Sequence, residues 1–242
     1  MKILSIGNSF SQDAQRYLHG IATSAGESAK CVNLYIGGCT LKTHYVNFFA
    51  QNNLYNLAVN GEALNIYVNI KEVLLSDDWD VITLQQQSSN SCKFDTMRPY
   101  IKKIADEIRF LCPNAKLYLH QTWGYENGSQ KLADAGYATM SDMFSDIRSS
   151  YAEASSFIDA DGLIPSGEAM LALCAAGVKA HRDTFHATLG AGRYLLGLVW
   201  FEKLFGKCCI GNTFSDFDEQ IDGQTLSLCQ KIAHETVNLS NQ

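Results

Sequence analysis

The sequence predicts a three-layer α/β/α sandwich built on a mostly parallel sheet of about five strands. Short apolar runs of strand length alternate along the chain with longer patterns of helical period. This alternation favours a parallel sheet that helices cover on both faces. No Pro-rich or Gly/Ser-rich linker and no internal repeat divides the 242 residues, so we expect one domain over residues 1–242.

The individual elements follow from the same patterns. We expect strands at 3–6, 31–36, 81–84, 116–119 and 156–159. We expect helices at 13–25, 41–51, 94–111, 137–153, 167–175, 189–204 and 224–238, and the Cys112-Pro113-Asn114 sequence marks the end of the third one. Residues 55–67 contain Asn60-Gly61, which is typical of a type I′ turn, and predict a hairpin that decorates the sheet.

Composition excludes several classes of function. The formal net charge of −6, from 25 acidic and 19 basic residues without a basic cluster, argues against a nucleic-acid partner. No run approaches the roughly 20 apolar residues of a membrane span. We therefore expect a soluble cytoplasmic protein, or a secreted or periplasmic one if an export signal preceded it. The eight cysteines include no Cys-x-x-Cys pair and are expected to be mostly buried thiols.

Ser9 has a privileged position in this predicted fold. It follows Gly7-Asn8 at the carboxyl end of the first strand and precedes a helix, and ligands of open α/β sheets collect at that edge. The free N–H groups of a helix start can stabilise an oxyanion. The alternative is that Ser9 or Ser11 only caps the helix.

A serine nucleophile needs a base and an acid that orients the base, and Asp183-Thr184-Phe185-His186 offers both. The three-residue spacing on a turn or first helical turn puts the two side chains on one side, with one imidazole nitrogen left for Ser9. Alternatively, Asp183 caps the following helix and His186 is an ordinary surface or core histidine.

Together, Gly7-Asn8-Ser9-Phe10-Ser11 and Asp183-x-x-His186 resemble the first and fifth blocks of the SGNH (GDSL-like) hydrolases, with Asn8 in place of the usual Asp. The likeness is closer to a bacterial branch that also carries Gly-Gly, Gln-x-Gln-Ser and Gln-Thr-Trp elements, here at 37–38, 85–88 and 121–123. The resemblance implies a flavodoxin-like sandwich with a Ser9, Asp183, His186 triad and no cofactor.

The resemblance also implies an oxyanion hole formed by the backbone N–H groups of Ser9 and Gly38, with Gly37 as the alternative. The family's third block supplies an Asn, but glutamines follow the third strand here. Alternation places Gln85 and Gln87 on one face of the chain. We choose Gln87 as the side-chain donor, and Gln85 and Asn90 stay open.

The substrate pocket is expected to include Asn8, Gln85 and Trp123, although packing explains Trp123 equally well. His44 and His120 are expected to be structural, Glu168 to lie in the first turn of a helix, and no metal site is expected. The sequence has neither a phosphate loop nor a dinucleotide-binding glycine motif, nor the Gly-x-Ser-x-Gly elbow of α/β-hydrolases.

The resemblance thus implies an esterase that acts on a small-molecule or carbohydrate ester, with carbohydrate O-acetyl groups or other small acyl groups as the first choice. A lipase or thioesterase of the same fold is an alternative. A non-catalytic ligand-binding protein and a flavodoxin-like regulatory domain are others, and the last predicts no contact between Ser9 and His186.

Overall fold

The computed structural model describes residues 1–240 and contains one seven-stranded sheet in the order β4-β3-β2-β1-β5-β6-β7. Five strands are parallel: β1 (Lys2–Gly7), β2 (Lys30–Tyr35), β5 (Val81–Leu84), β6 (Lys116–His120) and β7 (Gly162–Ile164). The antiparallel hairpin of β3 (Tyr55–Val59) and β4 (Glu62–Val68) extends one edge. The predicted layer architecture is confirmed, but the strand count is seven because the hairpin joins the sheet.

The hairpin turn has the backbone geometry that its sequence predicts. Asn60 has φ +52° and Gly61 has φ +86°, the two positive values of a type I′ turn. A Cβ at Gly61 would lie 2.3 Å from the backbone oxygen of Arg16, so the turn also packs closely on the chain after α1. Glycine is required at this position for both reasons.

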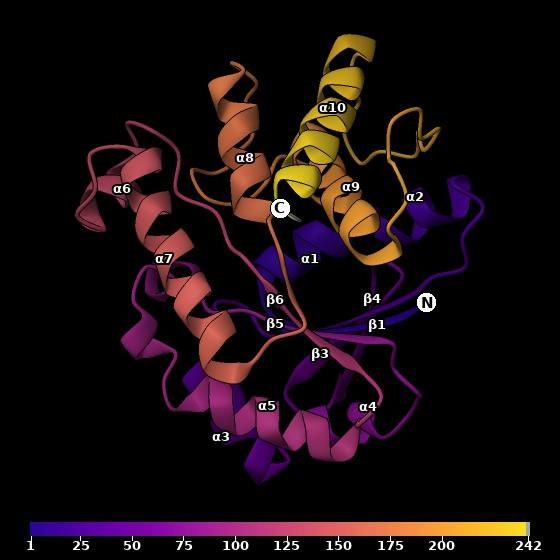
Figure 1. Ribbon diagram of the computed structural model, residues 1–242, viewed down its shortest axis with the longest axis vertical. Coiled ribbons are helices and arrows are strands. Elements are labelled where there is room, and N and C mark those ends of the chain that lie inside the picture. The colour runs from indigo at the N-terminus through magenta and orange to yellow at the C-terminus, as the bar shows by residue number, and fades with distance from the viewer. Residues whose placement is uncertain (241–242) are drawn as a thin grey trace.

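Helices cover both faces of the sheet (Figure 1). One face carries α1 (Ser9–Gln15), α2 (Leu18–Ser24), α8 (Ser166–Ala175), α9 (Ala191–Phe205) and α10 (Gly223–Leu239). The other carries α3 (Leu41–Ala50), α4 (Ile70–Leu74), α5 (Tyr100–Leu111) and α7 (Met140–Ile158), and the short α6 (Gln130–Asp134) precedes α7. Alternation along β1 sends Ile3 to the first core and Leu4 and Ile6 to the second.

Three predicted elements are wrong in place or extent. Residues 156–159 are the end of α7, which continues to Ile158 and stops at Asp159 with φ +52°; the strand comes later, at β7. The helix expected at 13–25 is two helices, α1 and α2, separated at Arg16 and Tyr17. The helix expected from residue 94 begins at Tyr100, because Pro99 has no N–H to donate within a helix.

A helix that crosses a bilayer needs roughly 20 mostly apolar residues. None of the helices formed by residues 1–240 combines the length and apolarity that crossing a membrane requires.

Candidate active site

Asn8 forms the turn that presents Ser9 at the end of β1. Its side chain is the N-cap of α1, because Oδ1 accepts a hydrogen bond from the Phe10 N–H at 3.0 Å. The same oxygen accepts from Gln85 Nε2 at 2.7 Å, and Asn8 Nδ2 donates to the Cys39 carbonyl at 3.2 Å. Asn8 therefore fulfils the capping role that Ser9 and Ser11 were considered for, and the Ser9 hydroxyl is left for another partner.

Gln85 is part of the support of this turn. It is buried, and its Oε1 lies 2.6 Å from His120 Nδ1 while its Nε2 bonds to Asn8. Burial lowers the pKa of His120 to about 3, so the ring is neutral and can donate from Nδ1. Because both ends of the Gln85 amide are engaged away from the solvent, the expectations that Gln85 lines the pocket or donates to an oxyanion are wrong.

Asp183 and His186 lie on a tight loop between residues 181 and 187, which an isolated antiparallel bridge between His181 and Ala187 closes. His186 Nδ1 is 2.7 Å from Asp183 Oδ2, and the His186 N–H donates to Asp183 Oδ1 at 2.9 Å. Thr184, between them, has φ +75°, which is strained for a β-branched residue. The loop is therefore held in an unfavourable backbone conformation that brings the carboxylate to the imidazole.

His186 also reaches Ser9, 177 positions earlier in the chain. Its Nε2 is 2.7 Å from Ser9 Oγ, so Ser9, His186 and Asp183 form a continuous series of hydrogen bonds through opposite nitrogens of one ring. Asp183 is not a helix cap, since α9 begins only at Ala191, after Gly190. The contact between Ser9 and His186 also contradicts the flavodoxin-like alternative, which predicted none.

The ionisation of Asp183 fits this arrangement. Its partial burial acts to raise the pKa of the carboxyl, but the hydrogen bonds from the His186 side chain and backbone outweigh burial and lower the pKa below its usual range. The carboxylate is thus charged at neutral pH and can orient the ring and stabilise an imidazolium.

Asp13, which the sequence analysis missed, connects α1, the helix of Ser9, to the loop of Asp183 and His186. This carboxylate on α1 is 1 % exposed and accepts from Arg182 Nη1 at 3.0 Å, from Arg193 Nε at 2.9 Å and from the Ala187 N–H at 3.2 Å. Arg182 and Ala187 lie next to Asp183 and His186. The only sequence signal was an acid one helical turn after Ser9, on a helix face that otherwise faces the core.

A pocket of about 370 Å³ opens over Ser9 and His186, a volume within the range of small-molecule sites. Its wall is formed by thirteen residues: Asn8, Ser9, Phe10, Gln12, Tyr35, Gly37, Gly38, Gln87, Ser88, Lys131, Arg182, Phe185 and His186. Asn8 is thus at the pocket as predicted, whereas Asn90 and Trp123 are not among these residues.

The predicted oxyanion donors Gly38 and Gln87 both line this pocket, as does the alternative Gly37. Gly38 has φ +62°, and within residues 1–240 no acceptor lies in range of the Gly37 or Gly38 N–H. Gln87 Oε1 accepts from Ser89 Oγ at 2.7 Å, which fixes the amide plane and leaves Nε2 without a partner in the described chain. Three unoccupied N–H donors therefore border the pocket that contains Ser9.

Trp123 has a supporting role instead of the pocket-wall role considered for it. Its ring is fully buried and stacks on Phe10 with centroids 4.0 Å apart and planes at 8°. Its Nε1 donates to the Phe185 carbonyl at 2.7 Å. Trp123 thus packs between the residue after Ser9 and the residue before His186 and contributes to their spacing.

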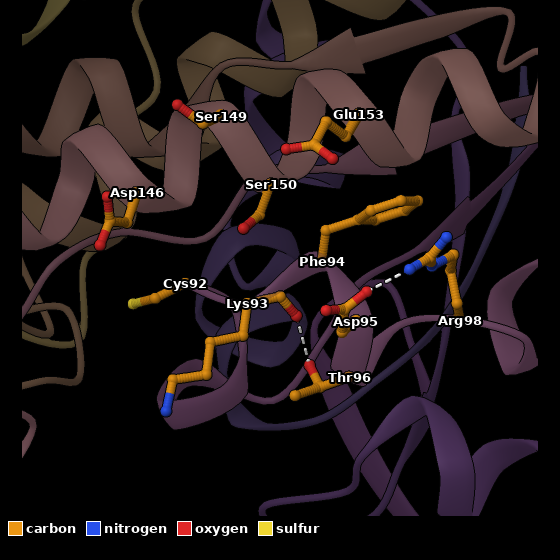
Figure 2. A pocket seen from close by; sticks show the side chains of 10 residues that line it. All are labelled: Cys92, Lys93, Phe94, Asp95, Thr96, Arg98, Asp146, Ser149, Ser150 and Glu153. Atoms are coloured by element: carbon orange, nitrogen blue, oxygen red, sulfur yellow. Dashed lines mark hydrogen bonds and ion pairs between the residues drawn. The ribbon is translucent and has the colours of Figure 1, made fainter.

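A hollow of about 640 Å³, larger than the Ser9 pocket, lies elsewhere, between α7 and the segment 92–98 (Figure 2). Acids and bases both line it, and two of them, Asp95 and Arg98, pair with each other. Its lining residues include no histidine that could serve as a base for Ser149 or Ser150. This hollow therefore does not reproduce the chemistry of the Ser9 pocket.

The remaining predicted residues are structural. Glu168 is in the first turn of α8 and pairs with Arg148 at 2.6 Å. His44 is buried next to the Tyr55 hydroxyl at 2.9 Å, and burial lowers its pKa to about 3.

Of the residues at 1–240, one group of possible metal ligands converges, at Glu202, Cys208 and His234. The Glu202 carboxylate and the His234 imidazole of this group already form a hydrogen bond of 2.6 Å.

The fold is that of the SGNH hydrolases. A protein from Slackia heliotrinireducens described as a candidate SGNH hydrolase matches with a TM-score of 0.59 at 22% sequence identity, over 84% of this chain and 97% of that one. A family 3 carbohydrate esterase from Clostridium thermocellum matches with a TM-score of 0.51 at 13% identity, over 84% and 94% of the two chains.

The chain belongs to the family described as domain of unknown function DUF4886, whose model matches residues 2–236. A DUF4886 family protein from Bacteroides uniformis ATCC 8492 has a crystal structure that matches with a TM-score of 0.93 at 29% identity, covering 100% of this chain and 96% of that one. No curated protein matches the chain.

Proposed function

We propose that this protein is a serine esterase in which Ser9 is the nucleophile, His186 the general base and Asp183 the orienting acid. The observation that carries the proposal is the series of two 2.7 Å hydrogen bonds from Ser9 Oγ through His186 to Asp183, at the floor of a pocket. In this geometry the imidazole can take the serine proton through Nε2 while Nδ1 stays bonded to the carboxylate.

The reaction proceeds in two halves. Ser9 Oγ attacks the ester carbonyl and its proton passes to His186 Nε2; the tetrahedral intermediate then expels the alcohol, which takes that proton from His186. Water next attacks the acyl-enzyme, giving one proton to His186, and the carboxylic acid leaves as Ser9 regains the proton. The N–H groups of Ser9 and Gly38, with Gln87 Nε2, are the proposed donors to the oxyanion in both halves.

Small acyl groups are the proposed substrates, with O-acetyl groups on carbohydrate first among them. The pocket volume of about 370 Å³ suits a short acyl chain, and its lining is mostly polar. The carbohydrate esterase among the structural neighbours is consistent with this choice.

A fluorophosphonate probe tests the proposal, together with hydrolysis of 4-nitrophenyl acetate. The wild type should be labelled and should hydrolyse the ester, and Ser9→Ala should abolish labelling and lower kcat by about 10⁴-fold or more. Ser11→Ala is the matched control, because Ser11 lies in the same turn but bonds to Asn33 and not to His186. Circular dichroism checks that each variant is folded.

The competing function is a non-catalytic ligand-binding protein on the same fold. It would give a folded wild-type protein that is neither labelled nor active, and that result would overturn the esterase proposal. Equal labelling of Ser9→Ala and the wild type would instead place the nucleophile elsewhere.

A further inference from the structure

The charged side chains that line the pocket over Ser9 are both basic, although the protein as a whole is acidic. Lys131 and Arg182 are the charged residues among the thirteen that line it, and neither Asp nor Glu is among them. The chain carries a formal net charge of −6. A cationic lining on an acidic protein indicates a ligand of opposite charge.

The two cations differ in how far the protein neutralises them. Arg182 bonds to the buried carboxylate of Asp13, so its charge is largely compensated. Lys131 has no acidic partner within the described part of the chain. Its ammonium instead lies over two rings, 4.2 Å from the Phe185 centroid and 5.1 Å from the Tyr125 centroid. Lys131 is therefore the uncompensated charge of the pocket.

The position of Lys131 brings this charge close to the proposed base. The Phe185 and His186 ring centroids are 3.9 Å apart, and the Lys131 ammonium is in contact with the Phe185 ring. A substrate bound over Ser9 and His186 would therefore bring an anionic group within reach of this ammonium.

We propose that the substrate ester carries an anionic group, such as a carboxylate, close to the scissile carbonyl, and that Lys131 binds it. This inference rests on the proposed esterase function and specifies its substrate class. The rings of Phe185 and Tyr125 hold the ammonium itself by cation–π contacts, so the charge is kept at the pocket before the substrate arrives.

Pairs of substrates that differ in charge test the inference. On the acyl side, 4-nitrophenyl hemisuccinate is compared with 4-nitrophenyl butyrate; on the alcohol side, the acetyl ester of 4-hydroxybenzoate is compared with that of 4-hydroxybenzamide. For each pair the ratio of kcat/KM, charged over neutral, is measured in the wild type and in Lys131→Met. Methionine keeps the apolar contact with the rings and removes the charge.

Lys131→Met should lower the ratio about fivefold in at least one pair, the effect of one partly exposed ion pair. The pair that responds identifies the side of the ester that carries the anion. Raising the salt concentration should lower the wild-type ratio as well. Lys103→Met is the control for net charge, because Lys103 is exposed on α5, and it should leave both ratios unchanged.

Ratios that are equal in the wild type and Lys131→Met for both pairs would overturn the inference while leaving the esterase function intact. A fall of the same size in Lys103→Met would also overturn it, since the effect would then come from net charge alone. Failure of the wild type to hydrolyse any of the four esters, with no probe labelling, would instead reject the esterase function itself.

Discussion

Replacement of Asp13 by Asn tests whether a buried charge holds the loop that carries Asp183 and His186. The substitution keeps the size of the side chain, removes the negative charge between Arg182 and Arg193, and turns one acceptor into an amide N–H that faces other donors. Removing one partner of a buried ion pair costs about 3–5 kcal/mol. Arg193 keeps its ion pair with Asp218, and the Arg182 side chain is 29% exposed. We therefore expect the free energy of unfolding to fall by about 3 kcal/mol, the lower end of that range.

Equilibrium urea unfolding measures this cost. With a slope of about 3 kcal/mol per M for a chain of this size, the midpoint should fall by about 1 M. The turnover of the folded variant should fall by about tenfold to a hundredfold at low temperature, because a displacement of about 1 Å at His186 is enough for such a loss. Circular dichroism at the assay temperature separates lost turnover from lost fold.

Asp218→Asn is the matched control. Asp218 also pairs with Arg193, and with Arg16, but its side chain is 24% exposed and it has no bond to the loop of Asp183 and His186. It should lower stability by about 1 kcal/mol or less and leave turnover unchanged. An unchanged urea midpoint in Asp13→Asn, or an equal loss in both variants, would refute the assigned role of the buried carboxylate.

Three further perturbations have definite expected outcomes. Gly61→Ala should lower the free energy of unfolding in urea by about 2 kcal/mol or more, because its φ of +86° is strained for alanine and the new Cβ would meet the Arg16 carbonyl. Acidification from pH 6.5 to 5 should lower the free energy of unfolding by about 1.6 kcal/mol in total for each of His44 and His120. Their pKa is about 3 in the folded protein but ordinary, about 6.5, in the unfolded chain, which binds more protons in this window. Gln87→Ala should lower kcat for 4-nitrophenyl acetate about 100-fold if its amide donates to the oxyanion.

The first of these predictions has a control variant within the chain, and the other two each have a result that would contradict them. Gly26→Ala has a similar φ of +77° with open space around its Cβ, so it isolates the backbone cost and should be the milder change. For acidification, a urea midpoint in His120→Gln that falls between pH 6.5 and 5 as steeply as in the wild type would contradict the histidine account. For Gln87, turnover within about threefold of the wild type would remove the residue from the oxyanion hole.

Local patterns were sufficient for most of the parallel sheet and for the hairpin. The strand at 81–84 was predicted with the bounds that the structure has, because the run is too short for a helix and consists mostly of β-branched residues. The Asn60-Gly61 turn was correct because its backbone requirement is a property of two residues. The strand at 156–159 was wrong because a long helix reached into it, and the capping box of Thr139 and Asp142 that starts α7 fixes only the other end.

The support of the site could not be predicted in the same way, because it depends on pairs that are distant in sequence. Gln85 follows the strand end like an oxyanion donor, but its amide is engaged by Asn8, 77 positions earlier, and by His120, 35 positions later. Asp13 and Arg182 are separated by 169 positions. The residue pattern of one segment carries no information about hydrogen-bond partners that are distant in sequence. Sequence analysis therefore overestimates how many polar side chains near a strand end are free to bind a substrate.

The proposed triad contains one pair of residues that is local in sequence and one pair that is distant. Asp183 and His186 are three residues apart, so a local turn can bring them together, and sequence alone was able to suggest the pair. Ser9 lies far from His186 in sequence, and Asp13, four residues after Ser9, is bonded to both sides of the 183–186 segment through Arg182 and Ala187. This buried carboxylate on the helix of Ser9 therefore helps to align Ser9 with His186 and to maintain the strain at Thr184. If that is correct, the site should lose its alignment before the sheet unfolds, and Asp13→Asn should lose turnover at urea concentrations where its far-ultraviolet circular dichroism is still native.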